Sequence, residues 1–194
     1  KMLPQLAHEH PEIARLLPVD PSERRWMREF LGPPFRRPQT LLGRIDAVFD
    51  LGSARWRESI RVLATNMVGV GASYYSWAAS RAVHETLAPW LERAFPGRRF
   101  RPDDDVLDLI LHSALDHAER IGARAETVCL LEEKCESGPA EFPLMAEIFR
   151  RRGYDVVVAD PGEIRVKRGR LLAADKPVDI LYRDPTVLNL LEMA

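Results

Sequence analysis

The chain has 194 residues, which is enough for one sizeable hydrophobic core, and its 28 Lys and Arg residues nearly balance its 29 Asp and Glu residues. Because this balance creates no global field, neither nucleic acid nor an anionic membrane is expected as a partner. No apolar run reaches the ~20 residues of a membrane span and no secretion signal is visible, so we expect one compact cytoplasmic unit. The two cysteines, Cys129 and Cys135, form neither a disulfide framework nor a metal motif.

Residues 1–43 are rich in proline and arginine and predict an N-terminal arm that contains a helix. Ser22 can cap this helix, and the sequence Gly32-Pro33-Pro34 ends it. The arm leads into two short runs, residues 44–52 and 58–64, whose apolar residues predict neighbouring β-strands.

The segment RVLATNMVGVGASYY, residues 61–75, raises the question of a ligand-binding turn. Gly69 and Gly71 let backbone amides approach a ligand closely, because no side chain blocks the approach. The nucleotide fingerprints are absent, however, since the third glycine of a dinucleotide loop would fall at Tyr74 and no Gly-Lys-Ser or Gly-Lys-Thr follows. These residues alone favour a strand-to-helix turn over a phosphate cradle.

Two amphipathic helices are predicted after this turn. Over residues 73–95 apolar side chains recur every three or four positions, and Pro89 is expected to bend this helix or to end its first part. The second helix begins with the aspartates 103–105, which suit the positive end of the helix dipole, and it ends at Gly122.

Three segments follow in the order strand, helix, strand: residues 126–132, 141–153 and 154–160. The helical segment places Phe142, Met145 and Phe149 on one face, and the last segment is a continuous apolar run typical of a buried parallel strand. A hairpin turning at residues 167–169 and a last strand at 178–183 complete the pattern. The sequence therefore predicts an α/β fold with a mainly parallel, doubly wound sheet and flanking helices. Three strand residues are expected to be buried: Leu130, Val157 and Ile180.

In an open α/β sheet, ligands bind beyond the carboxyl ends of the strands. Three predicted loops lie there: residues 65–73, 132–139 and 160–163. In the second loop, Ser137 and Gly138 stand before a helix and can present backbone amides to an anion, although a simple capped turn fits equally well. Arg183 ends the last strand and suits either a phosphate or carboxylate ligand or an ion pair with Asp184.

Other candidate groups fit ordinary surface roles. The pairs His112/Asp116 and His8/His10 are each short of the about three or four ligands that a metal site needs. Cys135 has no activating base nearby in the sequence. We therefore expect neither a metal site nor a catalytic residue in this chain.

The order of the segments resembles the pre-ATP-grasp region of the circularly permuted ATP-grasp proteins, the group that includes glutathionylspermidine synthase-like ligases. The resemblance covers about residues 44–184 and lies in a pattern. A strand leads to an Asn-Gly-Tyr loop, and a second strand is followed by a helix containing Glu-Phe. The stretch RRGYDVVVADP, a hairpin around RVKRGRLL and a strand ending in Tyr-Arg come next. The resemblance implies a Rossmann-like domain that precedes an ATP-grasp domain.

The resemblance also implies a function. Ligases of this kind use ATP and Mg²⁺ to activate a carboxylate as an acyl phosphate, which an amine then attacks. Five residues match the family's loop and its closing arginine and would be substrate-side residues: Asn66, Gly69, Gly71, Tyr74 and Arg183. Two positions depart from the pattern, since Ala64 stands where an acidic residue is frequent and Asp184 replaces a second arginine.

The C-terminal segment, residues 185–194, predicts the start of a helix with Asp184 as its cap and Pro185 at its first helical position. It is too short to hold ATP and metal ligands. We therefore expect no cofactor in this chain, ATP and Mg for the parent enzyme, a missing ATP-grasp domain as partner and a small-molecule carboxylate as ligand. The alternative is a stand-alone, non-catalytic Rossmann-like domain for binding or scaffolding, while a nucleotide-binding Rossmann enzyme is disfavoured by the absent glycine fingerprint.

Overall fold

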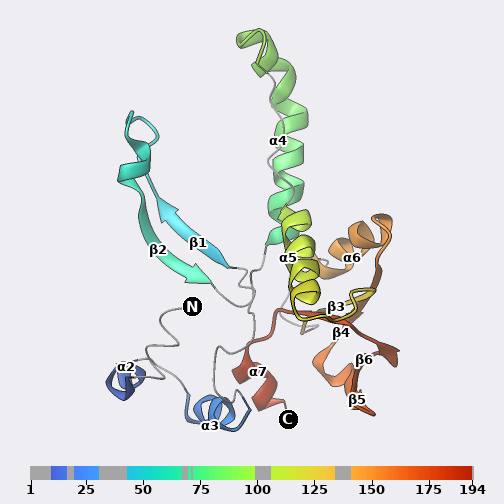
Figure 1. The fold of residues 1–194 in the computed structure, drawn as a ribbon. Helices are drawn as coiled ribbons and strands as arrows, with labels where there is room; N and C mark the ends of the chain where they lie inside the picture. Colours follow the sequence, from blue (N-terminus) through green and yellow to red (C-terminus); the bar gives the residue numbers. More distant parts are fainter. Residues whose placement is uncertain are drawn as a thin grey trace.

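The computed structural model describes residues 10–16, 20–30, 43–66, 70, 72–98, 106–133 and 141–193 (Figure 1). In chain order its elements are α2 (Pro11–Leu16), α3 (Pro21–Phe30), β1 (Arg44–Val48), a 3-10 helix η1 (Trp56–Ser59), β2 (Arg61–Asn66), α4 (Ser73–Ala94), α5 (Val106–Arg120), β3 (Thr127–Leu131), α6 (Glu141–Arg151), β4 (Asp155–Ala159), a second 3-10 helix η2 (Pro161–Glu163), β5 (Ile164–Lys167), β6 (Arg170–Ala173), β7 (Lys176–Pro177), β8 (Ile180–Arg183) and α7 (Val187–Glu192). None of the helices in these ranges is both long enough and apolar enough to cross a membrane.

The centre of the fold is a parallel sheet in the order β4-β3-β8. Leu130 of β3 lies between Val158 of β4 and Tyr182 of β8. Leu130 is fully buried and Val157 is 7% exposed, as predicted. Ile180, which was also predicted to be buried, is only half-buried. The predicted mixed α/β fold with a parallel sheet is thus confirmed.

The two faces of this sheet have different covers. On one face, Val128 and Leu130 pack with Leu107 of α5 and with Met145 and Phe149 of α6. On the other face lie side chains that pack with the antiparallel sheet β5-β6-β7: Cys129, Leu131, Val157, Ala159 and Ala173. A doubly wound sheet has helices on both faces. Here the β5–β6 hairpin packs on the second face, and Leu181 of β8 on the same face stays 39% exposed.

Strands β1 and β2 pair with each other, as predicted, but form a sheet separate from the central one. Their antiparallel register is irregular between Asp46 and Ala47, where the partner changes from Ala64 to Val62. Leu63 is the extra residue of this bulge. Figure 1 shows the β1–β2 ribbon and the far part of α4 extending away from the sheet.

Two predicted helix caps are corrected by the structure. At α3 the carboxylate of Asp20, not Ser22, is the cap, and it accepts a hydrogen bond from the Ser22 backbone N–H at 2.8 Å. At α7 the cap is Thr186, not Asp184, and it accepts from the Asn189 N–H at 3.1 Å while the Asn189 side chain accepts from the Thr186 N–H at 3.0 Å. Each segment offers several capping residues in a row, so local sequence does not select between them. The aspartates 103–105 lie outside the described residues.

The predicted end of α5 is confirmed, whereas Pro89 does not end the first part of α4. Helix α4 continues through Pro89 to Ala94, so the proline does not end its first part. Pro89 is exposed, and water can satisfy the carbonyl whose partner the proline removes. Helix α5 ends at Gly122, whose φ of 66° is cheap for glycine alone, and the Ala123 N–H returns to the Ala118 carbonyl at 2.9 Å.

Candidate functional site

The starts of α4 and α6 meet at the carboxyl edge of the parallel sheet. Glu141, the first residue of α6, is only 6% exposed. Its carboxylate accepts hydrogen bonds from the backbone N–H groups of Ala72 and Tyr74, each at 3.0 Å. These amides belong to the N-terminus of α4, 69 and 67 residues away in the chain. The first side chain of α6 thus fixes the start of α4, a helix that is distant in the chain.

Ala72 explains why α4 needs this distant carboxylate. It is the residue before the helix, and its φ of 65° and ψ of 16° place it in the left-handed region. It has no side-chain oxygen to cap the helix, and the left-handed conformation costs about 1–2 kcal/mol for a residue with a Cβ. Glu141 provides the missing acceptor and offsets this strain. Because its carboxylate already occupies these amides, they are not open to an external anion in this conformation.

Tyr182 of β8 completes the group of side chains at this edge. Its ring packs against Phe142 at a centroid distance of 5.8 Å, and its hydroxyl lies 3.5 Å from the Val70 carbonyl oxygen. The Ser73 hydroxyl donates to the same carbonyl at 3.0 Å. Burial, followed by the charges of Asp184 and Glu141, raises the pKa of Tyr182 to about 12. Tyr182 is therefore a protonated donor at neutral pH.

We call Val70, Ser73, Tyr74, Glu141 and Tyr182 the edge cluster. It joins the segment before α4, the first turn of α6 and the end of β8 through side-chain and backbone contacts. Chemically it offers a buried carboxylate, a tyrosine hydroxyl and a carbonyl oxygen in one place. Such groups can position a loop and donate or accept hydrogen bonds to a polar ligand.

Of the residues predicted for the site, Tyr74 lies in the edge cluster. Its ring packs towards the helix face of the core, 5.7 Å from the ring of Trp77. Asn66 ends β2 opposite Arg44, and its side chain lies outside the described residues. Four further predicted residues also lie outside the described residues: Gly69, Gly71, Ser137 and Gly138.

Arg183 lies at the same edge but on the other face of the sheet from Tyr182. Neighbouring residues of a strand alternate between faces, and Arg183 pairs with Leu131, which packs with the β5–β6 hairpin. Its Nη1 donates to the Pro185 carbonyl oxygen at 2.6 Å, which holds the chain between β8 and α7. The structure therefore does not bring the Arg183 side chain together with Tyr74 on one face.

The third predicted loop, residues 160–163, is a closed turn. The Glu163 carboxylate accepts from the Asp160 N–H at 2.8 Å, and the Asp160 carboxylate accepts from the Gly162 N–H at 3.0 Å. This reciprocal capping box accounts for both side chains in structural terms.

The remaining polar candidates have structural partners or are buried. Asp116 pairs with Arg120 at 2.7 Å rather than with His112. Cys129 is fully buried, and burial, followed by the charge of Glu163, raises the pKa of its thiol to about 11, which makes it a poor nucleophile. Within the described ranges no group of three His, Cys, Asp or Glu residues is arranged to hold a metal ion. His8 and Cys135 lie outside those ranges.

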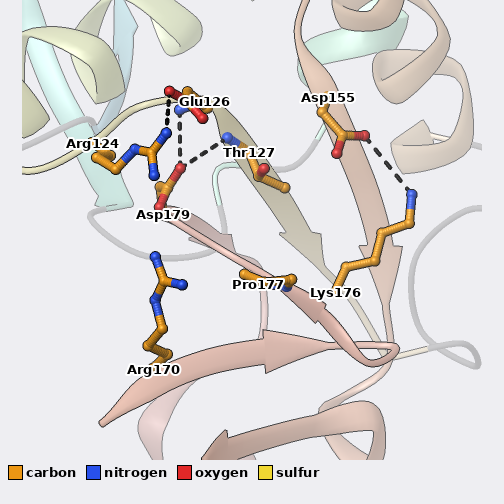
Figure 2. Close-up of a pocket in the computed structure, with 8 residues that line it drawn as sticks. All are labelled: Arg124, Glu126, Thr127, Asp155, Arg170, Lys176, Pro177 and Asp179. Carbon is orange, nitrogen blue, oxygen red and sulfur yellow. Dashed lines mark hydrogen bonds and ion pairs between the residues drawn. The ribbon is translucent and has the colours of Figure 1, made fainter. Parts of the chain in front are cut away.

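The opposite, amino edge of the sheet has a hollow of about 280 Å³ (Figure 2). Eight residues line it: Arg124, Glu126, Thr127, Asp155, Arg170, Lys176, Pro177 and Asp179. Three are cationic and three are acidic, so the hollow has no net charge to attract an ion. Ligands of α/β sheets bind at the carboxyl edge instead.

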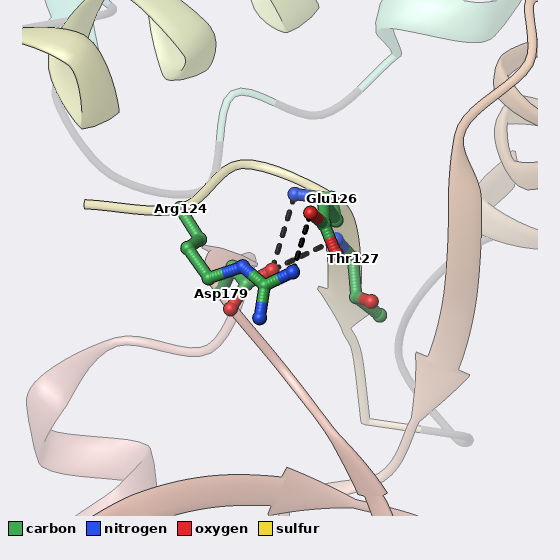
Figure 3. A network of polar contacts seen from close by, with 4 residues as sticks. All are labelled: Arg124, Glu126, Thr127 and Asp179. Carbon is green, nitrogen blue, oxygen red and sulfur yellow. Dashed lines mark hydrogen bonds and ion pairs between the residues drawn. The ribbon is translucent and has the colours of Figure 1, made fainter.

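Polar contacts account for most of this hollow's charged residues, and Figure 3 shows those among Arg124, Glu126, Thr127 and Asp179. The Asp179 carboxylate accepts from the backbone N–H groups of Glu126 and Thr127 at 3.1 and 3.2 Å, which fastens β8 to the start of β3. Arg124 pairs with Glu126 at 2.5 Å, and Lys176 lies 3.9 Å from Asp155. These contacts therefore have a structural role.

Sequence reasoning missed Glu141 and Tyr182. Glu141 was visible as an acidic residue in the first turn of a predicted helix at the carboxyl edge, but such a residue ordinarily serves its own helix. Tyr182 stood beside Arg183 at the end of the last strand, and only the alternation of faces decides which of the two meets α4 and α6.

Comparison with known proteins finds a likeness among solved structures but none among protein families or curated proteins. No protein-family model matches the chain, and no curated protein matches it significantly. Among solved structures, the chain is similar to a glutathione synthetase-like effector from Globodera pallida, solved in its apo form. The TM-score is 0.56 at 12% sequence identity, and the match covers 86% of this chain and 41% of that one. The chain thus spans less than half the length of that neighbour, and what the two share is the fold.

Proposed function

We propose that this chain is the substrate-side, pre-ATP-grasp domain of an ATP-dependent carboxylate–amine ligase related to the circularly permuted ATP-grasp proteins. The observation that carries the proposal is the fold likeness to the glutathione synthetase-like effector over 86% of the chain. The sequence pattern of residues 44–184 adds independent support. Residues 1–43 then form an arm of this domain, and residues 185–194 lead towards an ATP-grasp domain.

In this proposal the carboxyl edge of the sheet receives the carboxylate substrate. The loop residues Asn66, Gly69 and Gly71 would contact it through their backbone or side chains, as would Ser137 and Gly138 of the second loop. Glu141 is a positioning residue, since it holds the end of the first loop at Ala72 and Tyr74. A loop held in advance loses less entropy on binding, which favours both affinity and orientation.

The proposal assigns substrate binding to this chain and phosphoryl transfer to the ATP-grasp domain, and the chemistry of phosphoryl transfer is the reason. Mg-ATP, when held by the ATP-grasp domain, supplies the phosphoryl group that activates the carboxylate. Phosphoryl transfer needs cationic groups and a metal to neutralise developing charge in a water-poor site. The edge cluster has no cationic side chain, but its hydroxyl groups can orient a substrate, while its buried carboxylate holds the loop at Ala72 and Tyr74. Arg183 can supply one cationic contact from the other face of the sheet.

Two measurements test this proposal. The 194-residue chain, titrated calorimetrically with Mg-ATP, should show no binding at micromolar concentrations. Micromolar binding that Arg183→Ala abolishes would place a nucleotide site in this chain. It would refute the assignment of Mg-ATP binding to the ATP-grasp domain. The full-length gene product should consume ATP only when a carboxylate and an amine are both present. A gene product that never couples ATP consumption to bond formation would favour the alternative, a non-catalytic binding domain.

A further inference from the structure

The β1–β2 ribbon has one face that carries no charge. Cross-strand pairs put Ile45 with Thr65 and Ala47 with Val62 on this face, and Leu63 is the unpaired bulge residue next to Val62. Ile45, Val62 and Leu63 are 63%, 59% and 67% exposed. We call this surface the apolar ribbon face.

The opposite face of the ribbon, by contrast, carries charged side chains. It carries Val48 opposite Arg61, together with Arg44 and Asp46, whose side chains form an ion pair at 2.9 Å. Charged side chains thus gather on one face of the ribbon and are missing from the other. Such a division is typical of a ribbon with one face in water and one face against protein.

A two-stranded ribbon is at best marginally stable in water unless a further strand or a helix covers it. Among the described residues, the extensive contacts of β1 and β2 are with each other. The apolar ribbon face therefore lacks, within this part of the chain, the cover that its composition predicts.

Helix α4 has a second exposed apolar surface. Val83, Leu87 and Trp90 are four and three residues apart, which places them on one helical stripe, and they are 57%, 46% and 68% exposed. This stripe lies on the far part of α4, which extends from the sheet in the same direction as the ribbon (Figure 1).

We propose that the apolar ribbon face and the α4 stripe together form the docking surface for the ATP-grasp domain of the ligase, an inference that rests on the proposed function. The occupant is argued from length and chemistry. The match covers 41% of the solved neighbour, so more than half of that protein's chain lies outside the part that this fold represents. The apolar ribbon face carries no charged side chain, and on the α4 stripe Arg93 already stacks over the Trp90 ring at 4.7 Å. The surface therefore lacks the cluster of cations that nucleic acid or anionic lipid needs, whereas a folded domain buries apolar side chains.

Hydrogen exchange by mass spectrometry on the full-length gene product tests the docking surface. Peptides from β1 and β2 should exchange at least about tenfold more slowly in the gene product than in the 194-residue chain, because docking protects their amides. Val62→Glu should remove this protection. Val48→Glu, the same substitution on the opposite face and across from Arg61, should leave it intact. Trp90→Glu, at an exposed helical position, gives a second disrupting variant that does not touch the ribbon.

Three results would overturn the inference. Equal ribbon exchange in the gene product and the 194-residue chain would show that no domain docks there. Equal effects of Val62→Glu and Val48→Glu would show that the face does not matter. Protection that rises with the concentration of the 194-residue chain alone would assign the surface to a second copy. Ribbon protection in a gene product without ligase activity would refute the proposed function but support the docking surface. An active ligase with an unprotected ribbon would support the proposed function but refute the docking surface.

Discussion

Replacing Glu141 by alanine should destabilise the start of α4 without disturbing the rest of the core. The change removes two hydrogen bonds of 3.0 Å from a carboxylate that is 6% exposed. Hydrogen bonds to a charged group contribute about 1.5–3 kcal/mol each, and loss of a helix N-cap costs about 0.5–2 kcal/mol. Release of the desolvated carboxylate offsets part of this loss. We therefore expect the free energy of unfolding to fall by about 2–4 kcal/mol.

A matched series separates the capping role from a general effect of removing a charge. Glu141→Gln keeps one acceptor oxygen and should cost about half as much as Glu141→Ala. Glu147→Ala removes an exposed glutamate of the same helix, which pairs with Arg151, and should cost within about 0.5 kcal/mol. Urea denaturation followed by circular dichroism gives the three values.

Hydrogen exchange at the amides of Ala72 and Tyr74 gives a local test of the same contact. Both should exchange faster in Glu141→Ala, whereas amides of β3 should change only with the global stability. The reasoning is refuted if Glu141→Ala costs no more than Glu147→Ala, or if the two amides keep their protection. Either outcome would mean that α4 begins without help from α6.

Three further predictions concern the sheet. Val157→Asp should lower the free energy of unfolding by several kcal/mol, because the side chain is 7% exposed against the β5–β6 hairpin, and a soluble variant with unchanged stability would contradict the topology. Tyr182 has a pKa raised to about 12 in the folded state, against 10.0 unperturbed, so stability should be constant below pH 10 and fall as pH rises from about 10 to about 12. Tyr182→Phe should abolish this loss in denaturation curves taken across that range. In a Cys135→Ser background, the Cys129 thiol, with its pKa raised to about 11, should react with a thiol reagent at pH 8 only after unfolding, and rapid labelling of the native protein would refute its burial.

Local sequence determined the elements of this fold, because their signals lie within a few residues. The stripe of Phe142, Met145 and Phe149 predicts the buried face of α6, and all three are buried. Gly122 ends α5 because a left-handed residue is needed there, and the predicted hairpin turns at Arg168 and Gly169, both with positive φ.

Only the tertiary structure decided how these elements meet. The cap of α4 is a carboxylate 67 residues beyond Tyr74, and no periodicity or turn signal encodes a contact at that separation. The choice between Tyr182 and Arg183 at the edge depends on the register of β8 against β3, which sets the face of each side chain. The alternation in β1 correctly predicts a strand with an apolar face. Whether that face is covered depends on what packs there, which is a property of the assembled chain and not of the strand.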